Sequence, residues 1–272
     1  EIASEIAMFL CYEAMKDIEL IFENENIEYF SITSLENAEI INKRLMPAWA
    51  KTAIVFIIPY RTDYFPQKYL AHFAKVRDYH GFSKELFSRI IPLLEKKYPN
   101  NSFCGFADHS PINERKLAFE CGLGDVGMNG LLLNEKYGSY VFIGEILTDA
   151  TLPRRTYPLV QVCNKCESCI KACPRTNLCI SEISQKKKKT AEDFAILKKL
   201  NVVWGCDKCQ EVCHVNSASP LSPIEYFYKE QIKSVEEIPQ MSDERFEAYS
   251  FSYRGRKIIE ENIENIFKKD ID

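Results

Sequence analysis

Closely spaced cysteines constrain the fold of this chain more than any other feature. Eight of its eleven cysteines fall between Cys163 and Cys213. Disulfide scaffolds of this density belong to small secreted domains that cannot bury a sufficient core, whereas 272 residues can bury one large core, or one core and a compact satellite domain. We therefore expect these cysteines to be ligand thiolates in a reducing cytoplasm.

The spacing of the cysteines predicts two iron–sulfur clusters. The run Cys163-Asn-Lys-Cys166-Glu-Ser-Cys169-Ile-Lys-Ala-Cys173-Pro174 has the bacterial ferredoxin spacing, in which three thiolates hold one [4Fe-4S] cluster and the fourth holds another. Three later cysteines repeat the x2 and x3 spacings, and Cys179 completes eight ligands. The crossed pattern assigns Cys163, Cys166, Cys169 and Cys213 to one cluster, and Cys173, Cys179, Cys206 and Cys209 to the other.

Two alternatives to this ligand set stay open. A pair of tetrahedral zinc sites, each with four cysteines, would use the same residue types. Cys179 follows Cys173 closely, so Cys104 and Cys121 are the other candidates for the eighth ligand. If they are not ligands, they are expected to be core thiols.

Hydrophobic periodicity predicts an α/β domain before the cysteines and a helical tail after them. Residues 51–60 form a continuous apolar run, as in a central strand covered on both faces. The other expected elements are helices at 3–22, 83–97, 190–200 (with Thr190 as N-cap) and 258–267, and strands at 29–32, 103–107 and 139–147. We expect residues 1–158 to form the catalytic domain, 159–220 the two-cluster domain, and 221–272 a tail that packs back on the catalytic domain.

Iron–sulfur clusters transfer electrons but do no bond chemistry on a substrate, so a second cofactor is expected. Residues Gly122-Leu-Gly124-Asp-Val-Gly127 match G-x-G-x-x-G, but a helix-like segment precedes them and no helix pattern follows, so the dinucleotide-binding reading fails. Asp78-Tyr79-His80 is followed at once by glycine, which is not the spacing of a cobalamin-ligating Asp-x-His-x-x-Gly loop.

Charge and hydropathy limit the possible partners. The net charge of -4 gives no overall attraction to nucleic acid. Lys186 to Lys189 form the one candidate phosphate patch, although a charge run is more often a solvated face. No apolar run approaches the roughly 18 residues of a membrane helix, so no membrane partner is expected.

Several segments in conserved order resemble the epoxyqueuosine reductases, which are cobalamin-dependent iron–sulfur enzymes of tRNA modification. Besides the cysteines, including Cys179-Ile-Ser and Gly205-Cys206-Asp207-Lys-Cys209-Gln210-Glu-Val-Cys213, the matching segments are Arg77-Asp78-Tyr79-His80, Asp108-His-Ser-Pro111-Ile-Asn-Glu114-Arg115, Gly122-Leu-Gly124-Asp-Val-Gly127-Met-Asn129, Gly138-Ser-Tyr140-Val-Phe-Ile-Gly144-Glu145-Ile-Leu-Thr148 and Tyr253-Arg254-Gly255-Arg256. The resemblance runs from about residue 50 to about residue 262.

The resemblance implies an α+β fold, in which a nitroreductase-like α/β cobalamin-binding domain carries a ferredoxin-like insert with two [4Fe-4S] clusters. It implies that the clusters, fed by a ferredoxin or flavodoxin, reduce cobalamin to cob(I)alamin, which attacks the epoxide of a modified base in tRNA. Asp108 is then the acid that protonates the leaving oxygen, and Asp78 is a second polar residue beside the substrate. The implied cobalamin-contacting residues are Tyr79, His80, Asn129, Gly138, Ser139 and Tyr140.

Other readings compete with these roles. Asp108 is also placed to cap a following helix, and Asp78 to His80 to begin one.

The chain has Met128 where the family has lysine and His214 where it has proline. We expect a short, monomeric, cytoplasmic member without the C-terminal helical repeats that grip tRNA, so its substrate is tRNA or a smaller relative of the modified base. The alternatives are a dehalogenase-like reductase and a non-catalytic electron carrier.

Overall fold

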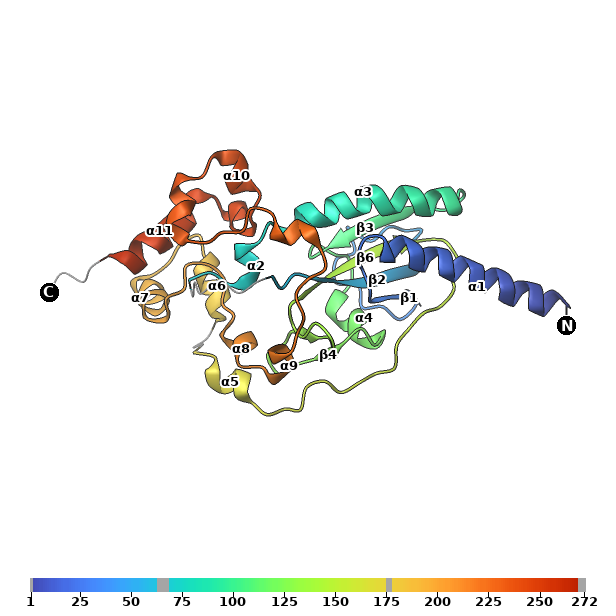
Figure 1. Ribbon diagram of the computed structural model, residues 1–272, viewed down its shortest axis with the longest axis horizontal. Coiled ribbons are helices and arrows are strands. Elements are labelled where there is room, and N and C mark those ends of the chain that lie inside the picture. Colours follow the sequence, from blue (N-terminus) through green and yellow to red (C-terminus); the bar gives the residue numbers. More distant parts are fainter. Residues whose placement is uncertain (1, 63–68, 175–177, 269–272) are drawn as a thin grey trace. The chain divides into compact units, whose positions relative to one another are not determined.

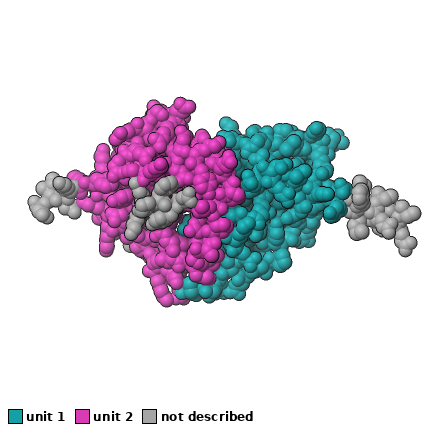
Figure 2. Space-filling view, in the orientation of Figure 1, with its two compact units in different colours: residues 1–59, 82–166 teal, residues 60–81, 167–272 magenta. Residues whose placement is uncertain are grey.

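The chain folds into a mixture of helices and strands. The computed structural model describes residues 2–62, 69–174 and 178–268 (Figure 1). They form two compact units, Glu1–Pro59 with Phe82–Cys166 and Tyr60–Gly81 with Glu167–Asp272 (Figure 2). We call them the sheet unit and the thiol unit.

The two units divide the helices and strands between them. The sheet unit contains α1 (Ile2–Glu23), β1 (Phe30–Ser34), β2 (Thr52–Pro59), β3 (Phe103–Ala107), α4 (Glu114–Glu120), β4 (Asp125–Val126), β5 (Leu132–Leu133), β6 (Val141–Thr148) and all of α3 (Tyr79–Lys97) after Gly81. The thiol unit contains α2 (His72–Lys75), α5 (Ser168–Ala172), α6 (Ile180–Gln185), α7 (Ala191–Leu200), α8 (Lys208–Glu211), α9 (His214–Ser217), η1 (Glu225–Tyr228), η2 (Val235–Gln240), α10 (Asp243–Glu247), η3 (Ser250–Arg254) and α11 (Arg256–Phe267).

A four-stranded sheet in the order β1-β2-β6-β3 organises the first unit. The apolar run in β2 is a central strand that is buried over nearly its whole length, as predicted. All three strand pairs are antiparallel, however, so the predicted α/β domain is corrected to an α+β arrangement. Periodicity identifies a buried strand but does not specify the direction of its neighbours.

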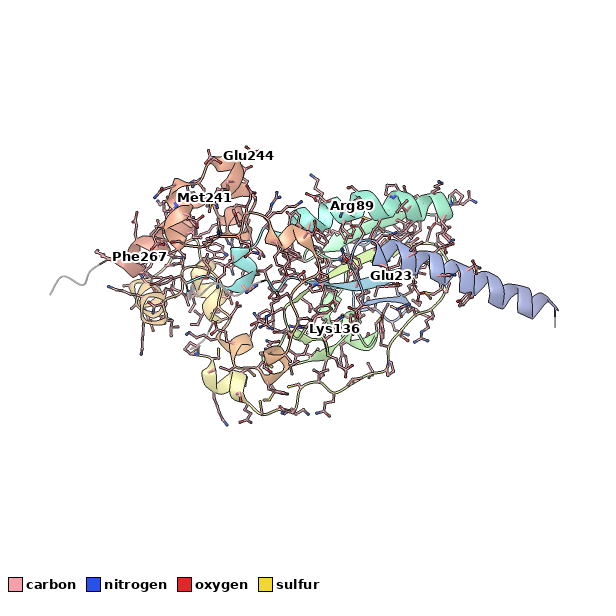
Figure 3. The ribbon with its side chains drawn as sticks, in the orientation of Figure 1. Glu23, Arg89, Lys136, Met241, Glu244 and Phe267 are labelled. Atoms are coloured by element: carbon pink, nitrogen blue, oxygen red, sulfur yellow. The ribbon has the colours of Figure 1, made fainter. Side chains whose placement is uncertain are left out.

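Helices cover both faces of this sheet (Figure 1). On one face, Phe56 of β2 packs against Phe22 of α1 and Phe87 of α3, with ring centroids 5.3 and 6.3 Å away. On the other face, α4 contributes Leu117 to an apolar cluster that includes Val55 of β2. Surface ion pairs such as Arg89–Glu25 and Lys136–Glu28, at 2.7 and 2.5 Å, lie outside this core and contribute little stability (Figure 3).

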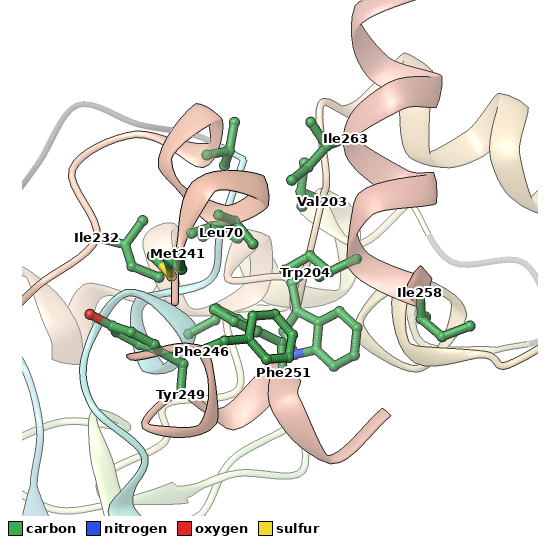
Figure 4. Close-up of a cluster of buried hydrophobic side chains, with 14 residues drawn as sticks. Leu70, Val203, Trp204, Ile232, Met241, Phe246, Tyr249, Phe251, Ile258 and Ile263 are labelled. Atoms are coloured by element: carbon green, nitrogen blue, oxygen red, sulfur yellow. The ribbon is translucent and has the colours of Figure 1, made fainter. Parts of the chain in front are cut away.

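The thiol unit has its own apolar core around Trp204, which is fully buried and meets Phe251 edge to face (Figure 4). Isoleucines of η2 and α11 complete this core. Residues 221–268 thus share a compact unit with the cysteine-bearing helices, whereas the sequence analysis placed the tail against the first domain. An amphipathic pattern shows that a helix buries one face but does not identify what covers it.

The local helix signals are confirmed. Thr190 caps α7, because its hydroxyl accepts a hydrogen bond from the Asp193 backbone and the Asp193 carboxylate accepts one from Thr190 in return. Within the described residues, no helix combines the length and the apolar character needed to cross a membrane.

Candidate functional site

Asp108 lies in a tight, exposed turn at the end of β3. Its φ of 62° is in the left-handed region, which costs a non-glycine residue roughly 1 kcal/mol or more. Two backbone hydrogen bonds hold the turn, from His109 N to Ala107 O at 2.7 Å and from Ser110 N to Asp108 O at 2.9 Å. A strained conformation that the surroundings enforce is a feature of functional loops.

The helix-capping alternative for Asp108 is wrong. The next helix, α4, is capped by Asn113, whose side-chain oxygen accepts a hydrogen bond from Lys116 N at 3.2 Å. The Asp108 carboxyl is therefore not needed to begin this helix.

Asp78, in contrast, begins a helix. Its Oδ1 accepts a hydrogen bond from His80 N at 3.1 Å and lies 2.8 Å from His80 Nδ1, at the first turn of α3. The rings of Tyr79 and His80 lie 4.2 Å apart. These three residues belong to the thiol unit, whereas Asp108 belongs to the sheet unit.

The other implied cobalamin residues lie in the sheet unit. Asn129 has a buried side-chain amide nitrogen without a hydrogen-bond partner among the described residues. Buried donors are nearly always paired, so this nitrogen is suited to an oxygen acceptor on a ligand. Gly138, with φ of 60°, exchanges two 2.9 Å backbone hydrogen bonds with Asn134, and leads into the buried Ser139 and Tyr140. These features fit a bound corrin.

The glycine cluster has a structural role that the sequence analysis missed. Residues 121–134 contain turns and the short strands β4 and β5 but no helix, which agrees with rejecting the dinucleotide fingerprint. Gly122, at φ 74°, lies so close to the Tyr157 carbonyl that a Cβ would collide with it. Asp125 Oδ2 accepts hydrogen bonds from Val162 N and Cys163 N at 3.1 and 2.9 Å. The cluster therefore fixes the start of the cysteine run.

Four cysteines of one predicted cluster lie close together in the thiol unit. The pKa of the Cys209 thiol is raised to about 12, mainly by burial and also by the neighbouring groups Cys206, Asp207, Cys173 and Cys179. Cys173 follows α5, which packs against α8, the helix that carries Cys209. Cys179 also raises the pKa of Cys206, and lines a cavity of 430 Å³. This grouping suits four thiolates sharing one cluster.

The other predicted set is divided, with Cys163 and Cys166 in the sheet unit and Cys169 and Cys213 in the thiol unit. It stays a prediction from spacing. In the described part of the chain, no three or more histidine, cysteine or acidic side chains are arranged to hold a single metal ion.

The fallback ligands Cys104 and Cys121 lie in the sheet unit. Burial raises the pKa of both thiols, that of Cys121 to about 11. These are the properties of core thiols.

A polar network behind the Cys206–Cys209 loop was also missed. Asp207 Oδ2 accepts a hydrogen bond from the backbone of His72 at 2.5 Å, and its Oδ1 accepts one from Gln210 at 2.7 Å. Burial lowers the pKa of His72 to about 3, so its ring is neutral and accepts a 2.9 Å hydrogen bond from Thr62 N. Asp207 thus joins α2 to the cysteine loop. The only signal for this role in the sequence was an acidic residue between two predicted cluster ligands.

Two of the four lysines in the basic run are used inside the fold. Lys186 pairs with Asp193 at 2.7 Å, and Lys189 donates to the Lys186 carbonyl at 2.8 Å. Lys187 and Lys188 are exposed. A phosphate contact from this run would therefore come from the middle two.

Comparison with known proteins adds sequence and fold relatives. No protein-family model matches the chain. An epoxyqueuosine reductase from Aliivibrio fischeri is 30% identical over 210 residues, which cover 68% of this chain and 56% of the relative. The chain thus spans about half the length of the curated relatives it matches.

Two solved structures share the fold. An epoxyqueuosine reductase with an epoxyqueuosine-modified tRNA-Tyr stem loop superposes with a TM-score of 0.75 at 20% identity, covering 94% of this chain and 81% of that one. An epoxyqueuosine reductase from Bacillus subtilis, with its catalytic aspartate loop swung out of the active site, gives a TM-score of 0.76 at 19% identity and the same coverages.

An antiparallel α+β unit and a unit with grouped thiols define a mixed α+β, thiol-rich protein. Within that class, sequence and fold together make this chain a relative of the epoxyqueuosine reductases, and the resemblance drawn from the motifs is confirmed.

Proposed function

We propose that this chain is an oxidoreductase of the epoxyqueuosine reductase type, which reduces the epoxide of a modified base in tRNA by means of cobalamin and two [4Fe-4S] clusters. The observation that carries the redox part is the grouping of Cys173, Cys179 and Cys206 around Cys209. The substrate is proposed from kinship, since curated relatives are named for this reaction and one solved relative holds the modified stem loop. As expected for that pathway, we place the protein in the cytoplasm, with a ferredoxin or flavodoxin as electron donor.

The residues divide the work as follows. Cys173, Cys179, Cys206 and Cys209 would hold one cluster, and Cys163, Cys166, Cys169 and Cys213 the other. Asn129, with its unsatisfied buried amide, and Gly138 to Tyr140 would hold cobalamin, and Tyr79 and His80 are the further contacts that the family resemblance implies. Bound cobalamin would supply the electrons that open the epoxide.

Asp108 is the proposed proton donor. Reducing an epoxide to an alkene takes up two electrons and two protons and releases the oxygen as water. Expulsion of that oxygen as an alkoxide is unfavourable at neutral pH, so a carboxylic acid beside it accelerates the step by about two to four orders of magnitude. Asp108 sits exposed in its turn, and the following helix is capped by Asn113 instead.

The test compares wild type with Asp108→Asn, purified anaerobically, on a stem loop that carries the epoxide. Turnover by the variant is expected to fall by about 100-fold or more, while iron and cobalt contents stay at about eight and one per chain. Asp149→Asn is the control, because that carboxylate accepts a hydrogen bond from the Ser102 backbone at 2.8 Å, and it should keep wild-type turnover. Retention by Asp108→Asn of more than about a tenth of the wild-type rate would make Asp78 the next candidate. Absence of turnover in wild type with full cofactors would overturn the proposed substrate.

A further inference from the structure

An acidic side chain is buried in the middle of the sheet, where no charge is expected. Glu145 of β6 is 1% exposed and lies opposite Val55 of β2 and Phe106 of β3 in the strand register. Its immediate neighbours on this face are apolar, and α4 covers them. A carboxyl at such a position destabilises the fold unless it is neutral or paired, so its retention calls for a role.

One hydrogen bond connects this acid to the turn that carries Asp108. Ser110 Oγ donates to Glu145 Oε2 at 2.5 Å and accepts from Ile112 N at 3.1 Å. The backbone N–H of Ser110 donates to the carbonyl of Asp108 at 2.9 Å. A continuous chain of hydrogen bonds therefore runs from the core of the sheet to the peptide of the proposed proton donor.

Glu145 is kept neutral by its surroundings. Burial raises its pKa from 4.5 to about 8, the Ser110 hydrogen bond lowers it, and the nearby Glu114 of α4 raises it. The two cations next to Glu114 on α4 are engaged elsewhere: Arg115 donates to the Gly130 carbonyl and Lys116 pairs with Glu39, both on the exposed side of the helix. Glu145 Oε1 is buried without a hydrogen-bond partner in the described structure, so an ionised carboxylate would be poorly compensated.

We propose that Glu145 is a positioning residue, which as a neutral acid holds Ser110 and thereby fixes the strained turn that presents Asp108 to the substrate. The catalytic part of this inference rests on the proposed function. Ionisation of Glu145 would strengthen its single hydrogen bond from Ser110 but would place a poorly compensated charge among apolar side chains, and hydration of that charge would open the packing beneath the turn.

The first test is hydrogen exchange of the peptide that covers residues 108–112, measured from pH 6 to pH 9 and corrected for the intrinsic pH dependence of exchange. The wild-type turn should lose protection above about pH 8, because Glu145 ionises there. Glu145→Gln, which keeps the shape and cannot ionise, should keep its protection level across this range, and Ser110→Ala should be less protected at every pH. Glu120→Gln, an exposed acid on α4, is the matched control and should follow wild type.

The second test is the pH profile of turnover. Wild-type kcat should fall above about pH 8, and Glu145→Gln should lack that part of the decline. Ser110→Ala should lower kcat by about 10- to 100-fold with little change in KM, as expected of a misplaced acid. A purely structural role for Glu145 would not change the shape of the profile.

Identical protection and identical pH profiles in wild type and Glu145→Gln would overturn the positioning role, as would loss of protection in Ser110→Ala with full kcat. Because hydrogen exchange needs no substrate, it decides whether Glu145 holds the turn even if wild type reduces no epoxide. A wild-type protein that reduces no epoxide would overturn only the proposed function.

Discussion

The two units of this protein each contain an acid with a raised pKa, and the acids are compensated differently. In the sheet unit, Glu145 has one hydrogen-bond donor, Ser110, and its pKa rises to about 8. In the thiol unit, Asp207 has two donors, the His72 backbone and the Gln210 amide, and the Lys75 cation also lowers its pKa, which rises only to about 6. Burial raises the pKa of both acids. The number of partners that stabilise the charged form determines how large each increase is.

The units also differ in what holds them together. The sheet unit rests on a continuous ladder of antiparallel strands between helices. The described residues of the thiol unit form short helices and no extended strand, and its cysteine loop is fastened by single contacts such as Asp207 with His72. We therefore expect the thiol unit to depend on its ligated clusters and the sheet unit to fold without them.

The largest expected effect separates the units by iron content. Replacing Cys209 with Ala removes the most buried thiol of its group, so iron should fall from about eight to about four atoms per chain, and turnover should be lost. Cys104→Ala, a core thiol of the sheet unit, is the control and should keep its iron. Iron analysis and electron paramagnetic resonance would measure both. Loss of iron in Cys104→Ala but not in Cys179→Ala would show that the eighth ligand was assigned wrongly.

The next prediction concerns stability and pH in the sheet unit. Folded Glu145 holds its proton up to about pH 8, whereas in the unfolded chain it ionises above pH 4.5, so wild-type stability falls between these values. Relative to wild type, Glu145→Gln should gain up to about 5 kcal/mol on going from pH 4.5 to pH 8. Urea unfolding at both pH values, with Trp49 reporting on the sheet unit, measures this gain. An equal stability difference at both pH values would contradict it.

The corresponding change in the thiol unit should have two opposing parts, because the raised pKa of Asp207 gives Asp207→Asn a gain between pH 3.8 and about 6 of the same sign as for Glu145→Gln. Asp207→Asn keeps the shape of the side chain. It leaves one acceptor oxygen in place of the two that accept hydrogen bonds from His72 and Gln210, and it removes the charge that faces Lys75. We expect the lost hydrogen bond, about 2 kcal/mol for a bond to a charged group, to offset most of that gain, so the stability of the thiol unit should change much less than that of the sheet unit. Urea unfolding followed through Trp204, which lies in that unit, provides the measurement. A gain as large as that of Glu145→Gln would show that this carboxylate is as poorly compensated as Glu145.

The smallest effect concerns the basic run of the thiol unit. Replacing the exposed Lys187 and Lys188 with Ala should reduce the slope of log affinity for tRNA against log salt by up to about two phosphate contacts. Lys186→Ala is the control, because that lysine is paired with Asp193 and should affect stability instead of binding. Salt titrations of tRNA binding by filter retention would test this. An unchanged slope in the double variant would favour a smaller substrate.

Much of the fold could be predicted from local patterns. The apolar run of β2, the Thr190 cap and the Pro-containing helix α3 each depend on neighbouring residues, so their positions could be read within a few residues of where they lie. The assignment of Cys173, Cys206 and Cys209 to one cluster came from spacing, because a cluster requires its thiolates to converge, and it stays a prediction. The direction of the strands did not follow, since antiparallel and parallel pairing bury similar side chains.

The sequence alone determined which residue types are present to hold clusters, and through its motifs which family the chain resembles. Only the tertiary structure showed that Asn113 and not Asp108 caps α4, that Asp125 holds the start of the cysteine run, and that Glu145 reaches Ser110. Glu145 and Ser110 are 35 positions apart, and Asp207 and His72 are 135 apart. Such contacts leave no periodic signal, because what joins them is the packing of the folded chain, and the pKa of a carboxyl depends on how completely that packing removes water from it.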